Sequence, residues 1–196
     1  MDSHARAVHR AGPRDHVVLF YQEARNDREL TETVGEYLLG ALRADEAAIV
    51  VGTWEHQLAF ARYLVRAGVD LASARARGTY LELDANGILE TFVMDSHADP
   101  ASFWAELTPV IRRAAESGQP VRIFGEMVAL LWEAGQIGAA IELEAMWNEL
   151  AAQFPFSLLC AYSVRSVAGS GQLDQLTEVC RAHSAVAGEP PAPSSR

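Results

Sequence analysis

The fold is decided by residues 16–52, which read HVVLFYQEARNDRELTETVGEYLLGALRADEAAIVVG. Two apolar runs, His16–Tyr21 and Ala47–Gly52, bound this stretch, and each has the length of a buried strand. Between them, apolar side chains recur at the spacing of one helix face. They are Leu30, Val34, Tyr37, Leu38, Ala41 and Leu42. A strand, a helix and a second strand in this order predict a crossover connection between two parallel strands.

The same alternation continues to about residue 186. Further strands are predicted over Thr79–Asp84, Val121–Gly125 and Phe156–Tyr162. Helices are predicted to begin near Asn26, to run to about Ala67 with Thr53 as the N-terminal cap, and to cover Pro100–Ser117, Met127–Ala134, Ile137–Phe154 and Gln172–Ser184. Gly68 and Gly118 are expected to end the helices before them. We therefore expect an α/β three-layer sandwich with a mostly parallel sheet of five strands or slightly more.

The length of 196 residues fits one domain with a single large core. Residues 1–14 show no apolar periodicity, and residues 187–196 are rich in Pro, Ser, Gly and Ala. We therefore expect a flexible N-terminus over 1–14, a single domain over 15–186 and a disordered tail over 187–196.

The charge balance excludes several functions. The net charge is −10, and all sixteen basic residues are Arg, because the chain contains no Lys. Phosphate-loop and Schiff-base chemistry, which use lysine, are therefore excluded. The acidic balance argues against direct binding of nucleic acid. Without a long apolar window or a signal peptide, we expect a cytoplasmic protein with no membrane contact.

The connection Gln22–Asp27 lies where an α/β domain of this order would hold a nucleotide. It reads QEARND, with neither Gly nor Lys, and Glu23 and Asp27 would repel phosphate. We therefore expect no nucleotide and no other cofactor.

Ligands of parallel sheets bind beyond the carboxyl ends of the strands. Tyr21, Trp54 and Tyr162 stand at predicted strand ends, together with Thr53 and Glu126. An apolar cup with a few polar groups is the usual form of a small-molecule site. These positions therefore predict the ligand-binding region, although Glu126 is equally well explained as an acid that stabilises a helix start.

Metal binding is not expected. Cys180 and His183 are spaced three apart on a predicted helix, but a buried thiol beside a helix-end histidine is the commoner arrangement. The acidic residues of the later helices have no histidine three positions on, and we expect them on solvated faces. They are Glu133, Glu142, Glu144 and Glu149.

The order of motifs resembles the MEDS family, a sensory domain named after methanogens, methylotrophs and the regulator DcmR. The central block, Gly125–Tyr162, is the most specific part. The matching blocks are HVVLFY (16–21), TWEH (53–56), LDA (83–85), GEMVALLW (125–132), LEAMWNEL (143–150), LLCAY (158–162) and CRAH (180–183). His97-Ala98 and Ser163 stand where this family is expected to have Gly and Pro.

The resemblance implies a RecA/KaiC-like fold with a degenerate nucleotide loop. It also implies a non-enzymatic sensor of small molecules, such as hydrocarbon derivatives, in prokaryotic signal transduction and transcription regulation. We expect this chain to act alone and to pass its signal by contact with a protein partner. A homo-oligomer is a further expectation, by analogy with RecA-like rings.

On this interpretation the ligand-binding residues are Tyr21, Thr53, Glu126, Tyr162, His16 and His183. No catalytic residue and no metal ligand are expected. Two alternatives remain open. One is a ligand-free module that binds an anti-sigma or kinase partner. The other is an enzyme that uses Glu126, Cys160 or His183.

Overall fold

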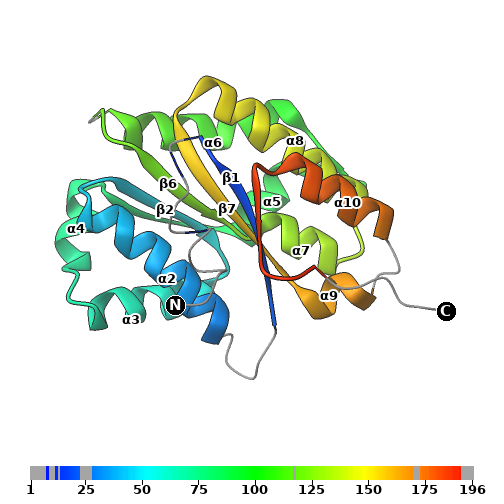
Figure 1. Ribbon diagram of the computed structural model, residues 1–196. Helices are drawn as coiled ribbons and strands as arrows, with labels where there is room; N and C mark the ends of the chain where they lie inside the picture. Colours follow the sequence, from blue (N-terminus) through cyan, green and yellow to red (C-terminus); the bar gives the residue numbers. More distant parts are fainter. Residues whose placement is uncertain are drawn as a thin grey trace.

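A computed structural model describes residues 8, 12, 14–22, 28–116, 118–169 and 173–190 (Figure 1). Six parallel strands form one sheet in the order β3-β2-β6-β7-β1-β8. They are β1 (His16–Tyr21), β2 (Ala47–Gly52), β3 (Tyr80–Asp84), β6 (Val121–Gly125), β7 (Phe156–Ser163) and β8 (Ala185–Ala187). A separate antiparallel pair joins β4 (Val93–Met94) to β5 (His97–Ala98). The parallel order of the main sheet is the one that the predicted crossovers require.

Helices cover both faces of this sheet, which confirms the predicted three-layer α/β sandwich (Figure 1). One face is covered by α2 (Arg28–Arg43), α3 (Trp54–Arg66) and α4 (Leu71–Arg77). The other is covered by α5 (Ala85–Phe92), α6 (Pro100–Ala115), α7 (Met127–Glu133), α8 (Ile137–Gln153) and α10 (Leu173–Ala182). The short helix α9 (Val164–Gly169) follows β7. Each face has its own buried apolar cluster, so the sheet is the shared wall of two cores.

Successive side chains of β1 point to opposite faces of the sheet, and this determines which side chains can contact each other. Leu19 and Tyr21 belong to the core under α2, α3 and α4, whereas Val18 and Phe20 belong to the opposite core. Strand β7 pairs in parallel with β1 and sets Tyr162 opposite Phe20. Tyr21 and Tyr162, both predicted at strand ends, therefore lie on opposite faces of the sheet.

The sixth strand, β8, was not predicted from the sequence. It pairs with β1 at the sheet edge, with Val17 opposite Ala185, and a three-residue strand is too short to show an alternating pattern. Ala187, the first residue of the predicted tail, is the last residue of β8 and is buried. Residues 191–196 of that tail lie outside the described residues.

The predicted helix ends at Gly68 and Gly118 are confirmed. Both glycines have a left-handed backbone, with φ of 88° and 73°, which side chains rarely adopt. The predicted helix start at Asn26, with most of the Gln22–Asp27 connection, lies outside the described residues. Of the predicted flexible N-terminus, Val8 is described, and it is buried in the core under α2, α3 and α4.

Candidate functional site

Three polar residues meet where β2 and β6 end. These strands are neighbours, with Val51 opposite Gly125, so the residues that follow them lie at the same edge of the sheet. Glu126 Oε2 accepts hydrogen bonds from the Thr53 backbone N–H at 2.7 Å and from the Thr53 hydroxyl at 3.1 Å. Its Oε1 lies 2.7 Å from Nδ1 of His56, on α3. We call Thr53, His56 and Glu126 the strand-end cluster.

Glu126 is only 8% exposed, so the position of its carboxylate is set by these partners rather than by water. Gly52 makes room for it, because a Cβ on that residue would lie 3.1 Å from Glu126 Oε2. Thr53 was expected to cap α3, yet its side chain makes no capping hydrogen bond among the described residues and bonds Glu126 instead. Its backbone N–H and hydroxyl both serve the strand-end cluster.

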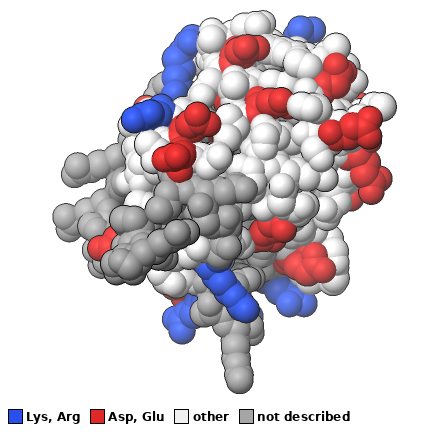
Figure 2. Space-filling view, turned by 90° about the vertical axis from the view of Figure 1, so that its right-hand side faces the viewer, with Lys and Arg blue, Asp and Glu red and all other residues white. Residues whose placement is uncertain are grey.

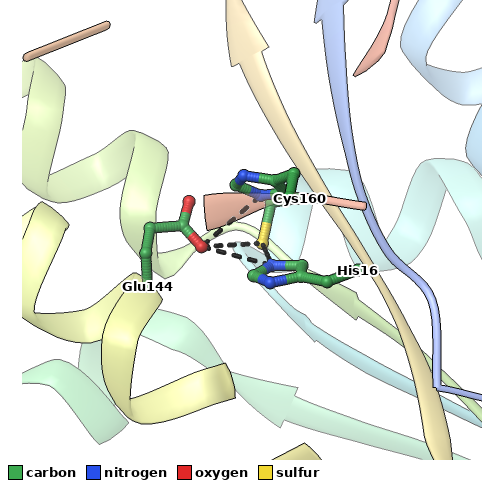
Figure 3. Close-up of side chains that lie close together, drawn as sticks. His16, Glu144 and Cys160 are labelled. Atoms are coloured by element: carbon green, nitrogen blue, oxygen red, sulfur yellow. Dashed lines mark hydrogen bonds and ion pairs between the residues drawn. The ribbon is translucent and has the colours of Figure 1, made fainter. Parts of the chain in front are cut away.

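A second cluster is buried on the face covered by α8 and α10 (Figure 3). His16 begins β1, Cys160 lies within β7, Glu144 projects from α8, and His183 follows α10. The Glu144 carboxylate points at the Cys160 sulfur and the His16 ring (Figure 3). All four residues are buried, and their donor atoms lie within 4.8 Å of one another. We call these four residues the buried cluster.

The distances inside the buried cluster are short. His16 Nε2 lies 3.2 Å from Glu144 Oε2 and 3.3 Å from Cys160 Sγ. Glu144 Oε2 lies 3.8 Å from Cys160 Sγ and 3.5 Å from His183 Nε2. The two imidazole rings also contact each other, with centroids 3.9 Å apart. One carboxylate oxygen is therefore the common neighbour of both histidines and the thiol.

The expectation that Glu144 lies on a solvated helix face is wrong. Glu144 is 1% exposed, and its neighbours Leu143 and Trp147 on α8 are buried with it. Leu143 and Trp147 are four apart and mark the core face of α8, and Glu144 lies beside them on that face. This spacing was the signal in the sequence that could have identified Glu144.

Both histidines of the buried cluster are oriented by acceptors outside it. Asn148 Nδ2 donates to the carbonyl of Ala182 at 3.0 Å, which turns its Oδ1 toward His16 Nδ1 at 2.9 Å. His183 Nδ1 donates to the carbonyl of Val179 at 2.6 Å. Each Nδ1 therefore donates a hydrogen bond away from the cluster, and each Nε2 is the ring nitrogen that faces it.

Burial sets the charges of the buried cluster. Burial raises the pKa of Cys160 well above its ordinary value, and the Glu144 charge raises it further. Burial lowers the pKa of His183, against the opposing effect of Glu144. Burial alone would raise the pKa of Glu144, but His183, His16 and Tyr162 outweigh it and lower that pKa. The cluster thus combines an ionised carboxylate, a neutral His183 and a protonated thiol.

The predicted ligand residues do not form one cup. Thr53 and Glu126 meet in the strand-end cluster, and His56, which the prediction left out, completes it. His16 and His183 belong to the buried cluster, and Tyr162 donates a hydrogen bond to Glu144 at 2.7 Å. The two clusters are neighbours, because Cys160 pairs with Gly125, the residue before Glu126.

Two predicted aromatic positions lie elsewhere. Tyr21 packs on the opposite face of the sheet, in the core under α2, α3 and α4. Trp54, the first residue of α3, is 66% exposed. Of the pair Cys180 and His183, only His183 is a member of the buried cluster, whose thiol is that of Cys160.

One surface hollow lies away from both clusters. It is a groove of about 770 Å³ between α2 and α3, lined mainly by long side chains. They include Arg28, Thr31, Glu32, Arg62, Tyr63 and Arg66. Wide surface grooves with charged walls accommodate water well, and we give more weight to the buried, hydrogen-bonded groups as the functional centres.

The fold and these centres define a parallel α/β domain with polar groups at the sheet's carboxyl edge and in one of its cores. Comparison with protein families matches residues 15–184 to MEDS, the methanogen/methylotroph, DcmR sensory domain. The chain belongs to this family of sensory domains. No match was found among curated proteins. Within the described residues, no helix has both the length and the apolar character needed to cross a membrane.

Proposed function

We propose that this sensory domain binds a small molecule at the strand-end cluster and passes the signal on by protein contact. The observation that carries the proposal is the Glu126 carboxylate, almost enclosed at the carboxyl edge of the sheet and held by Thr53 and His56. Parallel sheets bind ligands at the carboxyl ends of their strands, and a fixed hydrogen-bond acceptor there can recognise a ligand.

The chemistry of this edge favours an apolar ligand with one hydrogen-bond donor. The His56 ring stacks on Phe60 with centroids 5.9 Å apart, so the carboxylate has an aromatic neighbourhood. An oxygenated hydrocarbon derivative, such as a small alcohol, would donate to Glu126 and pack its carbon chain beside the His56 ring. This agrees with the hydrocarbon derivatives that we expected from the family resemblance.

We further propose that the domain is not an enzyme. The raised pKa of Cys160 keeps its thiol protonated, which removes the thiolate that a cysteine nucleophile needs. The Gln22–Asp27 connection, without Gly or Lys, supports a RecA/KaiC-like domain whose nucleotide loop is degenerate. A cytoplasmic role in transcription regulation or another prokaryotic signalling pathway follows from this proposal.

Protein rather than nucleic acid is the proposed signalling partner. Figure 2 shows acidic side chains scattered over one face, with basic side chains near its rim. Among the atoms drawn there, the basic side chains do not gather into a patch of the kind that binds phosphates.

A ligand-free interaction module is the second candidate, and one observation favours it. Trp54, Leu58 and Val65 are exposed on α3, with Trp54 and Val65 at 66% and 57%. Their spacing of four and seven residues places them along one helix face. An exposed apolar stripe of this kind is typical of a protein contact.

A binding experiment separates these two candidates. The freshly purified chain is compared by native and denaturing mass spectrometry, and is then heated with a panel of small alcohols and related hydrocarbon derivatives. A retained mass, or a higher melting temperature with one compound class, is the expected result for a sensor. A chain that responds to no compound but captures a protein through α3 would favour the interaction module.

Glu126→Gln tests the site itself. The amide oxygen still accepts from the Thr53 N–H, so the fold should survive while the charge is lost. The ligand-induced rise in melting temperature should disappear in this variant. Glu149→Gln, the same change at an exposed position on α8, is the control and should retain it. If Glu126→Gln responds like the unmodified chain, the ligand does not bind at the strand-end cluster.

A further inference from the structure

The buried cluster has the dimensions of a tetrahedral metal site. Zinc holds nitrogen and oxygen at about 2.0–2.1 Å and sulfur at about 2.3 Å, so neighbouring ligand atoms lie about 3.3–3.6 Å apart. Glu144 Oε2 and His16 Nε2 form one such edge, at 3.2 Å. Three more edges measure 3.3, 3.5 and 3.8 Å. The widest pair of donor atoms is separated by at most 4.8 Å, which a shift of about 1 Å would close.

Two ring nitrogens of the cluster also point inward. His16 and His183 each donate from Nδ1, to Asn148 and to Val179, so the Nε2 atoms are the ring nitrogens that face Glu144 and can bind a cation. Nε2 of His183 is buried and makes no hydrogen bond within the described part of the chain. Two nitrogen lone pairs beside a carboxylate repel one another unless a cation lies between them.

The charges favour a divalent cation over a proton. Binding of a divalent metal M²⁺ displaces the thiol proton of Cys160, which leaves to solvent, and forms the metal–sulfur bond. The thiolate and the Glu144 carboxylate then balance the two positive charges, and both imidazoles bind the metal as neutral ligands. The occupied centre has no net charge, which is the state that a buried site tolerates.

We propose that His16, Glu144, Cys160 and His183 bind Zn²⁺, or a similar borderline transition metal, in a closed tetrahedral site. Two imidazoles, a thiolate and a carboxylate are ligands that zinc accepts, whereas magnesium and calcium prefer oxygen alone. Asn148, Val179 and Tyr162 form the outer layer that orients these ligands.

Such a centre would be structural rather than catalytic, because four protein ligands leave no open position for substrate. It would join β1, β7, α8 and the segment between α10 and β8 through one ion. The inference extends the function proposed above and does not depend on ligand binding at Glu126.

The first test uses the full chain, purified without nickel affinity and without chelator. Elemental analysis should find close to one zinc per chain after growth with added zinc. The metal-free chain should then take up Co²⁺ and show the intense visible bands of a tetrahedral site, with a thiolate-to-cobalt band in the near ultraviolet. A folded chain that takes up neither metal at millimolar excess would overturn the proposal.

The two cysteines supply a matched pair of variants. Cys160→Ser should lose the thiolate-to-cobalt band and more than about 100-fold in zinc affinity, beyond the loss expected for an outer-layer residue. Cys180→Ser, which removes the half-buried thiol outside the cluster, should retain both. If Cys160→Ser retained the cobalt band and zinc affinity while Cys180→Ser lost them, the metal would bind elsewhere, and the buried cluster would be excluded as its site.

His183→Gln keeps the test decisive if Cys160→Ser does not fold. His183 lies after α10, outside the regular elements, so this change leaves the strands of the sheet intact. Near-ultraviolet circular dichroism verifies the fold before metal is added. Zinc should raise the unfolding midpoint of the unmodified chain and of Cys180→Ser, but not that of His183→Gln. An equal rise in all three would show that zinc binds outside the buried cluster.

Discussion

Tyr162 on β7 donates a hydrogen bond to Oε1 of Glu144 on α8 over 2.7 Å, and both side chains are almost completely buried. This contact fixes the rotation of the carboxylate. It leaves Oε2, the other oxygen, to face His16, Cys160 and His183. The Tyr162 hydroxyl therefore positions the buried cluster without being one of its four members.

Tyr162→Phe should keep the fold and weaken the metal site. The ring remains packed edge-on against Trp132, with centroids 5.7 Å apart. Loss of an orienting hydrogen bond should reduce zinc affinity about 10- to 100-fold, as measured by competition with a chelating dye. The metal-free chain should lose about 1.5–3 kcal/mol of unfolding free energy in urea, since the acceptor is charged. Unchanged zinc affinity would contradict a role for Glu144 as a ligand.

Thr53→Val should destabilise the strand-end cluster, while Thr53→Ser should be nearly neutral. Valine has a similar shape but leaves Glu126 without the hydroxyl donor at 3.1 Å, and serine keeps that donor. We expect Thr53→Val to cost about 1–3 kcal/mol of unfolding free energy. Urea unfolding of both variants measures the difference. A loss in Thr53→Ser with none in Thr53→Val would mean that the methyl group, not the hydroxyl, is what matters here.

Gly35→Ala on α2 should destabilise the domain, although alanine favours helices. An added Cβ would overlap the ring of Tyr63 on α3, so helices that now pack closely would have to separate. Overpacking of this kind costs about 1–3 kcal/mol, which exceeds the gain of about 0.5–1 kcal/mol from replacing glycine in a helix. Gly138→Ala on α8 is the control, because no described heavy atom lies within 4 Å of its added Cβ. Thermal unfolding should move down for the first variant and up for the second.

Stability should fall steeply in alkali. Burial raises the pKa of Tyr63 to about 12, and its hydrogen bond to Glu36 contributes. Burial raises the pKa of Tyr37 and of Tyr80 still further. An unfolded tyrosine has a pKa of about 10, so above that pH the unfolded chain loses protons that the folded chain keeps. The stability from these residues is thus complete below about pH 10 and decreases as pH rises toward the folded pKa values.

Urea unfolding between about pH 8 and pH 11 measures this loss, and tyrosinate absorbance reports when the side chains ionise. Tyr80→Phe removes one buried phenol near Glu82 and Arg75, so its stability should decline less over the same pH range. An equally steep decline would assign the alkaline loss to other groups.

Much of the fold could be predicted because most strands of the sheet are short, continuous apolar runs in the sequence. The ranges predicted for His16–Tyr21, Ala47–Gly52 and Val121–Gly125 are those observed for β1, β2 and β6. Strand β8 could not be predicted, since its three residues become a strand only by pairing with β1.

The site could be predicted only where the position of a residue in the sequence also determines its place in the fold. Thr53 and Glu126 each follow a strand, and parallel neighbours bring such residues to one edge. Glu144 could not be recognised by charge, because acids on helices usually face water. Its burial depends on His16 and His183, which come from the two ends of the domain, and no local pattern shows that they converge.

His16 and Ser184 are 168 positions apart, yet the backbone N–H of His16 donates to the Ser184 hydroxyl at 3.0 Å. The Ser184 N–H donates in return to the carbonyl of His16 at 2.7 Å. A chain still emerging from the ribosome lacks this closure, and lacks His183, until nearly the whole domain has been translated. Three members of the buried cluster, His16, Glu144 and Cys160, are translated before His183, so the cluster cannot form until His183 has been added. Completion of the centre therefore requires that synthesis of this domain is nearly finished, and it separates complete domains from shorter fragments of them.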